Sequence, residues 1–178
     1  MFDKLFKRFF DKATPVATST THVLLYAPVS GQLIPLEQVS DPMFAQKMLG
    51  DGMAIEPSSQ QIVAPFDGTV VAPFPTGHAI GLRSQAGLEC LIHIGIDTVT
   101  LHGQGFRLLV EQGQKIGRGT PLIDLDLAVL LASGKDLVTP VVITNSEDWL
   151  IEQRCEQSTI LAGTDILFIA RPADNATL

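Results

Sequence analysis

The sequence predicts an all-β protein: a single antiparallel β-sandwich or barrel-like domain with short helical turns and an N-terminal amphipathic helix. Three observations predict it. From residue 22 onward, short apolar segments alternate with Gly, Pro, Asp or Ser at close spacing, which is typical of sandwiches and barrels. The 178 residues fit one domain, and 46% hydrophobic residues can build its core. A seven-residue pattern also occurs twice.

The expected elements follow one another at short intervals along the chain. Helical turns are expected near 42–48 and at 127–133. The expected strands are the short apolar runs between turn residues, at 23–27, 32–36, 61–64, 68–72, 79–83, 89–94, 105–109, 120–126, 141–144 and 165–169.

The repeated pattern reads Ala-Pro-Val-Ser-Gly-Gln-Leu at 27–33 and Ala-Pro-Phe-Asp-Gly-Thr-Val at 64–70. In each copy, Pro ends one extended segment and Gly permits a tight turn before the next. Three further glycines punctuate 110–122, as occurs where a β structure bends sharply. The repeat is compatible with a domain built from two facing halves.

The first residues differ in character from the rest of the chain. Residues 1–12 contain four basic and two acidic residues, and their Phe and Leu residues at 2, 5, 6 and 9 fall on one helical face. Charges interrupt these apolar residues, so the segment is not a secretory signal. We expect an amphipathic membrane-association helix at 1–12, a flexible linker at 13–22, the folded domain at 23–170 and a tail at 171–178. A helix packed on the domain is the alternative.

Composition excludes several classes of protein. A net charge of −7 argues against nucleic-acid binding through phosphates. No apolar run approaches the ~18 residues of a membrane-spanning helix. Two cysteines, Cys90 and Cys155, are too few for a disulfide scaffold or a Cys-rich zinc site, and they favour a reducing compartment.

Histidines are the residues best suited to chemistry. His93 lies in the apolar run 90–97, where it would share one strand face with Leu91 and Gly95. His78 follows the turn residues Pro-Thr-Gly at 75–77, and the hydroxyl of Thr76 could fix its tautomer. The other two histidines, His22 and His102, have polar surroundings in the sequence and are expected at the surface.

A hairpin would bring His78 and His93 together. If 76–83 pairs with 88–95 through a turn at 84–87, the two histidines lie directly opposite each other, with Cβ atoms ~5 Å apart. Such a pair can transfer a phosphoryl group, ligate a metal ion, or act as acid and base. A hydrolytic site would also need a carboxylate, for which Asp97 is the nearest candidate. A buried, hydrogen-bonded, neutral His93 without chemistry is the alternative.

The segment LIHIGIDTV at 91–99 resembles the active-site segment of the glucose-type enzyme IIA family of the bacterial phosphoenolpyruvate-dependent sugar phosphotransferase system. The N-terminal residues 2–5 resemble the helix of its free-standing members, so the resemblance spans residues 2–169. Other segments match the family in order, at 27–31, 44–45, 50–52, 64–69, 76–79, 103–106 and 139–142.

The resemblance implies a phosphotransferase component: a phosphocarrier that forms a phosphohistidine in a shallow apolar depression of an antiparallel β-sandwich. His93 would take phosphate from the phosphohistidine of HPr and pass it to a cysteine of the membrane sugar permease, EIIB/EIIC. His78 would stabilise the transferred group, and Thr76 would hydrogen-bond His78. Backbone N–H groups near Gly95 would add hydrogen bonds to the phosphoryl oxygens.

Rim residues, cofactors and further partners are also implied. Phe44 and Phe74 match rim residues that contact partners, and Asp41 and Asp97 match acidic positions that would meet the basic surface of HPr. No cofactor is required, although His78 and His93 could bind zinc with a ligand supplied by a partner. Sugar transporters, glycerol kinase and adenylate cyclase would be regulatory partners.

The expected location is the cytoplasm, with transient contact at the inner face of the membrane through residues 2–10.

Three alternatives come from other classes of protein. A lysostaphin-type zinc peptidase needs an H-x-H pair, which this chain lacks. A biotinyl or lipoyl carrier needs a lysine at a hairpin tip beside Met or Asp. Lys115 lacks such a neighbour, and Lys135 comes before its neighbouring Asp, the reverse of the order that such carriers need. A binding module without covalent chemistry is the third.

Overall fold

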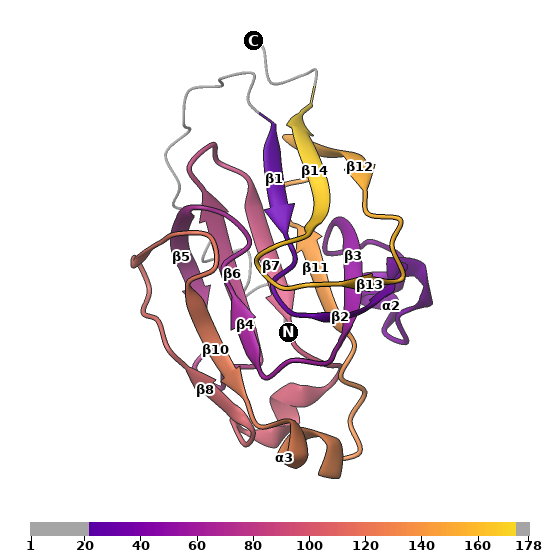
Figure 1. The fold of residues 1–178 in the computed structure, drawn as a ribbon, viewed down its shortest axis with the longest axis vertical. Coiled ribbons are helices and arrows are strands. Elements are labelled where there is room, and N and C mark those ends of the chain that lie inside the picture. The colour runs from indigo at the N-terminus through magenta and orange to yellow at the C-terminus, as the bar shows by residue number, and fades with distance from the viewer. Residues whose placement is uncertain (1–21, 174–178) are drawn as a thin grey trace.

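Strands dominate the computed structural model, which describes residues 22–173 (Figure 1). The expected N-terminal helix, nearly all of the expected linker and the last five residues of the expected tail lie outside this range. The strands are β1 (Val23–Tyr26), β2 (Gly31–Ile34), β3 (Asp51–Pro57), β4 (Gln61–Val63), β5 (Gly68–Pro73), β6 (Ala79–Ser84), β7 (Glu89–His93), β8 (Phe106–Leu108), β9 (Lys115–Ile116), β10 (Pro121–Leu125), β11 (Thr139–Ile143), β12 (Trp149–Arg154), β13 (Thr159–Ile160) and β14 (Ile166–Pro172). Short helices lie between them: η1 (Leu36–Gln38), α2 (Pro42–Ala45), η2 (Thr98–Leu101) and α3 (Leu127–Ala132).

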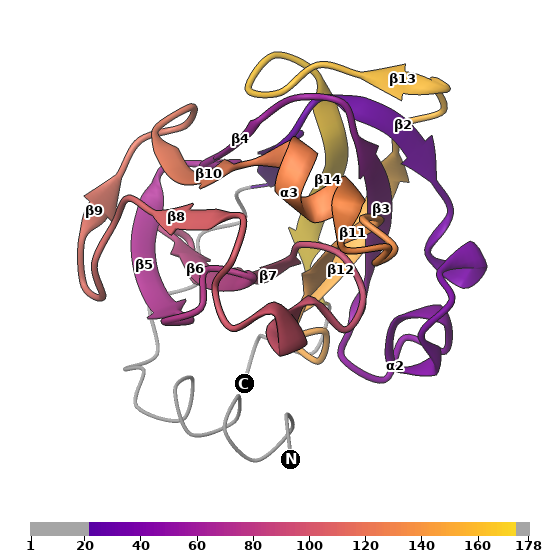
Figure 2. The same cartoon turned by 90° about the horizontal axis from the view of Figure 1, so that it is seen from below.

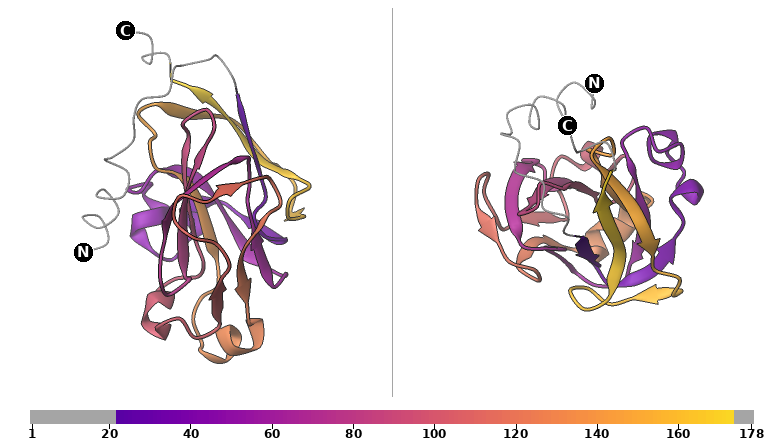
Figure 3. Two further views of the ribbon diagram at one scale, coloured as in Figure 1. Left: turned by 90° about the vertical axis from the view of Figure 1, so that its left-hand side faces the viewer. Right: turned by 90° about the horizontal axis from the view of Figure 1, so that it is seen from above.

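The strands form three antiparallel sheets, which confirms the predicted fold class. The largest has the order β13-β2-β3-β11-β7-β6-β5-β9, and the two smaller ones have the orders β4-β10-β8 and β1-β14-β12. Seen end-on, the sheets surround a common interior, and α2 stands outside it beyond β3 (Figure 2). The β1-β14-β12 sheet and α3 lie at opposite ends of the long axis (Figures 1 and 3).

The two copies of the seven-residue repeat lie against each other where they begin. The N–H of Tyr26 donates to the carbonyl of Pro65 (3.0 Å), and the N–H of Val63 donates to the carbonyl of Pro28 (2.8 Å). The repeat glycines begin β2 and β5. An added Cβ would lie 1.9 Å from the Glu56 carbonyl oxygen at Gly31 and 2.1 Å from the Arg83 carbonyl oxygen at Gly68, so only glycine fits.

Two strands of substantial length were not predicted. β3 lies between β2 and β11 in the largest sheet, although its sequence, DGMAIEP, contains few strand-favouring residues. The backbone of β11 approaches so closely that a Cβ at position 52 would lie 2.0 Å from the carbonyl oxygen of Val141, which explains Gly52. β12 is an edge strand with mostly exposed or half-exposed side chains, so its sequence lacks a clear hydrophobic alternation. Pairing with neighbouring strands, rather than the local sequence, therefore makes both segments strands.

Apolar side chains form two separate clusters. The larger cluster fills the interior between the sheets and includes Phe168, Leu25 and Ile92. The smaller cluster covers the outer face of the largest sheet beneath η1 and α2; its buried members are Leu36, Val39, Phe44, Ala54, Ala72, Phe74, Ala79, Leu91, Ile96 and Val142. The largest sheet is therefore apolar on both faces, and this second cluster contains the surroundings of both site histidines.

Candidate active site

His93 ends β7, a strand buried on both faces. Cys90 and Ile92 point into the interior cluster, whereas Leu91 packs in the outer cluster. Strand alternation places His93 on the same face as Leu91, as the sequence predicted. Its side chain is nearly covered, because the residue keeps only 7% of its exposure.

The predicted register of the hairpin is wrong by one residue. Ala79, not His78, is the strand partner of His93. The hairpin closes from Ser84 to Leu88 around three loop residues, with the N–H of Ser84 donating to the Leu88 carbonyl (2.8 Å). Gly87 takes the positive φ of 94° that such a loop requires. The predicted turn at 84–87 has four loop residues, one more than the structure shows.

His78 nevertheless reaches His93, because it precedes β6 rather than lying in it. The turn from Phe74 to Gly77 is closed by a 2.8 Å hydrogen bond, and Gly77 has φ of 68°, which redirects the chain. The N–H of Ile94 then donates to the His78 carbonyl (2.7 Å). The centroids of the two imidazole rings lie 5.2 Å apart, with 79° between the ring planes.

The backbone of Gly95 defines the tautomer of His93. Nδ1 of His93 lies 2.8 Å from the carbonyl oxygen of Gly95. A carbonyl oxygen can only accept, so Nδ1 carries the proton and Nε2 carries the lone pair. This contact is separate from the predicted hydrogen bonds between backbone N–H groups near Gly95 and phosphoryl oxygens, which stay a prediction.

Thr76 lies beside His78, as the sequence suggested. Its Oγ1 is 2.5 Å from Nδ1 of His78. When the hydroxyl donates this bond, the proton of a neutral His78 resides on Nε2, which then becomes a hydrogen-bond donor. The neighbouring rings in that tautomer combine a nucleophilic nitrogen on His93 with a donor nitrogen on His78.

Two phenylalanines enclose the histidines. The ring of Phe44, from α2, lies 5.3 Å from that of His93, and the ring of Phe74 lies 5.4 Å from that of His78. Both phenylalanines are buried in the outer cluster, and only 2% of His78 is exposed. The two phenylalanine rings therefore shield the two histidines from much of the solvent.

Burial lowers the pKa of both histidines. The pKa of His78 falls to about 4, mainly through desolvation and secondarily through repulsion from His93. Desolvation also lowers the pKa of His93, while the Gly95 carbonyl and the charges of Asp41 and Asp97 oppose the shift. Both imidazoles are consequently neutral at pH 7, which leaves His93 with the ring-nitrogen lone pair that a nucleophile needs.

This shift makes stability depend on pH. Between pH 6.5 and 4, the unfolded chain protonates His78 but the native protein does not. Native stability therefore falls as the pH drops through that window, by up to about 3 kcal/mol from this residue. Urea unfolding followed by the fluorescence of the buried Trp149 measures it. His78→Gln should flatten the curve below pH 6.5, and parallel curves for the two proteins would contradict the assignment.

A small pocket of about 140 Å³ opens beside His93. Its charged lining residues are Asp41 and Asp97, both predicted as rim positions. Asp41 also begins α2, where its Oδ1 accepts from the N–H of Met43 (2.8 Å). Asp97 has the left-handed φ of 56°. The remaining lining residues are apolar apart from His93: Met43, Phe44, Leu49 and Val99. An acidic rim around an apolar floor suits a protein partner with a basic, partly apolar surface.

Some of these residues escaped the sequence-based prediction. Met43, Leu49 and Val99 are ordinary apolar residues whose only signal is proximity to the quoted motifs. Thr98 is fully buried and donates its hydroxyl to the Ile94 carbonyl (2.5 Å). A polar residue inside an otherwise apolar motif was the available signal for it.

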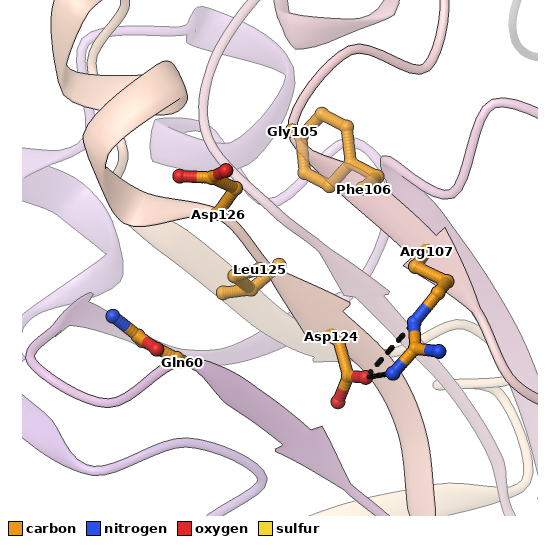
Figure 4. Close-up of a pocket in the computed structure, with 7 residues that line it drawn as sticks. All are labelled: Gln60, Gly105, Phe106, Arg107, Asp124, Leu125 and Asp126. Carbon is orange, nitrogen blue, oxygen red and sulfur yellow. Dashed lines mark hydrogen bonds and ion pairs between the residues drawn. The ribbon is translucent and has the colours of Figure 1, made fainter.

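A larger, more open pocket of about 450 Å³ lies between β8, β10 and the start of α3 (Figure 4). Its charged residues are already engaged, since Arg107 forms an ion pair with Asp124 and Asp126 accepts from the N–H of Val129. None of the predicted site residues lines it. Phe106 also packs closely against Gly77, the residue before His78, because an added Cβ at Gly77 would lie 2.8 Å from the Cβ of Phe106.

Residues 22–173 contain neither a preformed metal site nor a membrane-spanning helix. No group of three His, Cys, Asp or Glu side chains there is arranged to hold a metal ion. Over the same range, every helix is too short or too polar to cross a membrane.

Comparisons with known proteins match most of this chain. The family model of the phosphoenolpyruvate-dependent sugar phosphotransferase system, EIIA 1, matches residues 23–149. A glucose-specific EIIA component from Staphylococcus epidermidis is 45% identical over 143 residues, covering 80% of this chain and 84% of that protein. A glucose-specific EIICBA component from Staphylococcus saprophyticus is 54% identical over 128 residues, covering 72% of this chain and 19% of that protein.

A solved structure shares the fold. The glucose permease IIA from Mycoplasma capricolum matches with a TM-score of 0.78 and 34% sequence identity, covering 86% of this chain and 99% of that one. The resemblance first seen around His93 is thus confirmed over most of the domain. The chain belongs to the EIIA 1 family of the phosphoenolpyruvate-dependent sugar phosphotransferase system.

Proposed function

We propose that Nε2 of His93 carries the phosphoryl group as a phosphohistidine. One observation supports this most strongly: Nδ1 donates to the Gly95 carbonyl, so the attacking lone pair belongs to Nε2. The lowered pKa keeps the ring neutral and nucleophilic at pH 7. As the N–P bond to His93 forms, the N–P bond to the HPr histidine breaks, and the electron pair of that bond returns to the HPr imidazole.

The direction of transfer follows from the family. As the EIIA component of the phosphotransferase system, the chain accepts phosphate from HPr and passes it to EIIB. A phosphoimidazole suits both steps, because a neutral imidazole is a good leaving group. The transition state is metaphosphate-like, so the protein mainly aligns the groups and supplies hydrogen-bond donors.

We assign the donor role to His78. With Thr76 donating to its Nδ1, the Nε2–H of His78 can point toward the oxygens of a phosphoryl group on the neighbouring ring. Its low pKa means that it donates as a neutral imidazole. The apolar walls formed by Phe44 and Phe74 keep out water that would hydrolyse the phosphohistidine.

Phosphorylation in a purified system tests this function. The protein is incubated with phosphoenolpyruvate, enzyme I and HPr, and its intact mass is measured. We expect one added phosphoryl group that acid removes and base does not, as is typical of phosphohistidine. A mass that does not change, or an acid-stable group, would contradict the proposal.

The acidic rim would receive HPr. The pocket beside His93 is flanked by Asp41 and Asp97, whose negative charges raise the pKa of His93 and would attract a basic surface. Expected partners are HPr and the EIIB and EIIC parts of the permease, which one relative contains in a single EIICBA chain. We expect the protein in the cytoplasm, where these phosphorylated partners act.

We also propose regulatory binding controlled by phosphorylation. Sugar transporters, glycerol kinase and adenylate cyclase are the expected partners, and they would bind the apolar site around His93 only when it is unphosphorylated. A phosphoryl group would bring up to two negative charges into a nearly dry interface. We expect weaker binding of such a partner by the phosphorylated protein in calorimetry; equal affinities would contradict the switch.

Zinc would bind only within such a complex. The chain supplies two histidine ligands, His78 and His93, whereas a closed zinc site needs four ligands. To bind the ion through Nε2, His78 would carry its proton on Nδ1 instead and donate it to Oγ1 of Thr76. Calorimetry with Zn²⁺ should give weak binding to the isolated protein and tight binding once a partner adds a carboxylate. Tight binding that is unaffected by His78→Gln would contradict this site.

Residues 2–10 are proposed to contact the membrane. Their sequence combines four apolar residues on one helical face with the cations Lys4, Lys7 and Arg8. Each cation near an anionic surface contributes roughly 1 kcal/mol. Weak tethering would raise the encounter rate with the permease, so deleting residues 2–10 should slow transfer to the membrane-embedded permease without slowing acceptance from HPr. Equal transfer rates would favour the packed helix instead.

A further inference from the structure

The loop that follows His93 has an unusual backbone. Gly95 and Asp97 both have positive φ, of 71° and 56°, and Asp97 is not a glycine. An L residue in this region costs energy unless its surroundings hold it there. The loop must keep this shape, because it places the Gly95 carbonyl beside Nδ1 of His93.

Three hydrogen bonds hold the part of the loop that lies next to His93 and Gly95. The N–H of Ile94 donates to the carbonyl of His78 (2.7 Å), and the N–H of Ile96 donates to the carbonyl of Asp136 (2.8 Å). The third comes from a side chain, since Oγ1 of Thr98 donates to the carbonyl of Ile94 (2.5 Å). The Ile94 peptide groups are therefore tied to His78 on one side and to Thr98 on the other.

The other branch of Thr98 contacts the loop as well. A Cβ built at Gly95 would lie 2.5 Å from Cγ2 of Thr98, so the methyl group packs directly over the Gly95 backbone. Thr98 is completely buried, with 0% of its surface exposed. Its hydroxyl and methyl groups thus act on the two residues that follow His93, and β-branching restricts the side chain to few rotamers.

We propose that Thr98 is a positioning residue for phosphoryl transfer: it holds the Gly95 carbonyl in place and thereby keeps the proton of His93 on Nδ1. The inference rests on the proposed role of Nε2 as the attacking atom. Without the Thr98 hydroxyl, the Ile94–Gly95 segment can relax, and the Gly95 carbonyl no longer favours one tautomer. A ring that carries its proton on Nε2 cannot attack phosphorus with that atom.

Three variants separate positioning from general stability. Thr98→Val removes the hydroxyl and keeps the shape, and Thr98→Ser keeps the hydroxyl but removes the methyl group. Ser84→Ala is the matched control. Ser84 Oγ accepts from the N–H of Leu88 (3.0 Å) in the loop that joins β6 and β7, at the end of the hairpin away from His93. Its loss should lower stability without affecting His93.

Two readouts are needed. Nitrogen NMR shifts of the unphosphorylated His93 ring report the tautomer, and single-turnover transfer from phospho-HPr reports function. For Thr98→Val we expect a shift toward the Nε2–H tautomer and about 10-fold slower acceptance, the equivalent of one buried hydrogen bond. Thr98→Ser should retain the Nδ1–H tautomer and most of the rate, and Ser84→Ala should match the parent protein in both.

An unchanged tautomer in a folded Thr98→Val protein would overturn the inference. If Thr98→Val does not fold, Thr98→Ser still decides, because loss of the Nδ1–H tautomer despite the retained hydroxyl would contradict it. Failure of the proposed function is distinguishable: the parent protein would then not be phosphorylated on His93, whereas the tautomer measurement needs no phosphate.

Discussion

Replacing His93 with Gln should abolish phosphorylation of the protein by phospho-HPr. The variant keeps a polar side chain of similar size at the end of β7 but has no ring nitrogen with an available lone pair. The nearby His78 should not substitute, because its Nδ1 contacts Thr76 and its role in the pair is that of donor. Intact-mass measurement after incubation with the general carriers should show no added mass.

The matched control is His102→Gln. His102 is an exposed histidine in the same stretch of chain, and its loss should leave labelling at the level of the parent protein. The fluorescence of the buried Trp149 reports whether each variant is folded. Full labelling of a folded His93→Gln protein would end the assignment of the acceptor.

Replacing His78 with Gln should have a different outcome. The variant should still accept phosphate from HPr, because Nδ1 of His93 continues to donate to the Gly95 carbonyl and Nε2 remains the nucleophile. Transfer onward to EIIB should slow by ~10²–10³-fold, because a flexible amide replaces the fixed ring donor and aligns poorly with the developing transition-state charge. Single-turnover assays of each half-reaction measure the two effects separately.

Thr76→Val is the companion variant for this experiment. It leaves the His78 ring in place and removes the hydroxyl that lies 2.5 Å from Nδ1. We expect a smaller loss than for His78→Gln, confined to the same onward step. Equal losses in both half-reactions for either variant would indicate a general disturbance of the site, and normal onward transfer by His78→Gln would contradict the donor role.

The proximity of the two histidines could be predicted from the sequence, because the hairpin could. The backbone conformation that brings His78 to His93 could not. Hairpin pairing between β6 and β7 was inferable from the turn residues at 84–87, yet the true pairing is Ala79 with His93. A shift of one residue normally moves a side chain to the opposite face of a sheet. His78 avoids this because Gly77, at φ of 68°, redirects the chain before β6 begins. Sequence patterns alone do not give that backbone angle.

The fold class was predictable because turn residues and short apolar runs are local signals. Their limits appear at β3, where Asp, Gly, Ala and Glu argue against a strand, but pairing with β2 and β11 imposes one. The second apolar cluster was also invisible, because it joins residues from η1, α2 and five strands that are spread over much of the sequence. Phe44 and Asp41 were identified as site residues through the family resemblance, whereas their placement beside His93 depends on how α2 packs over that cluster.

The atom that carries phosphate tests the account most directly. The phosphorylated protein, labelled on its histidine ring nitrogens, can be examined by nitrogen and phosphorus NMR to find which ring nitrogen is bonded to phosphorus. The hydrogen bond from Nδ1 to the Gly95 carbonyl predicts a phosphorus–nitrogen bond at Nε2 of His93, with the proton retained on Nδ1. Phosphate on Nδ1 of His93, or on His78, would contradict it.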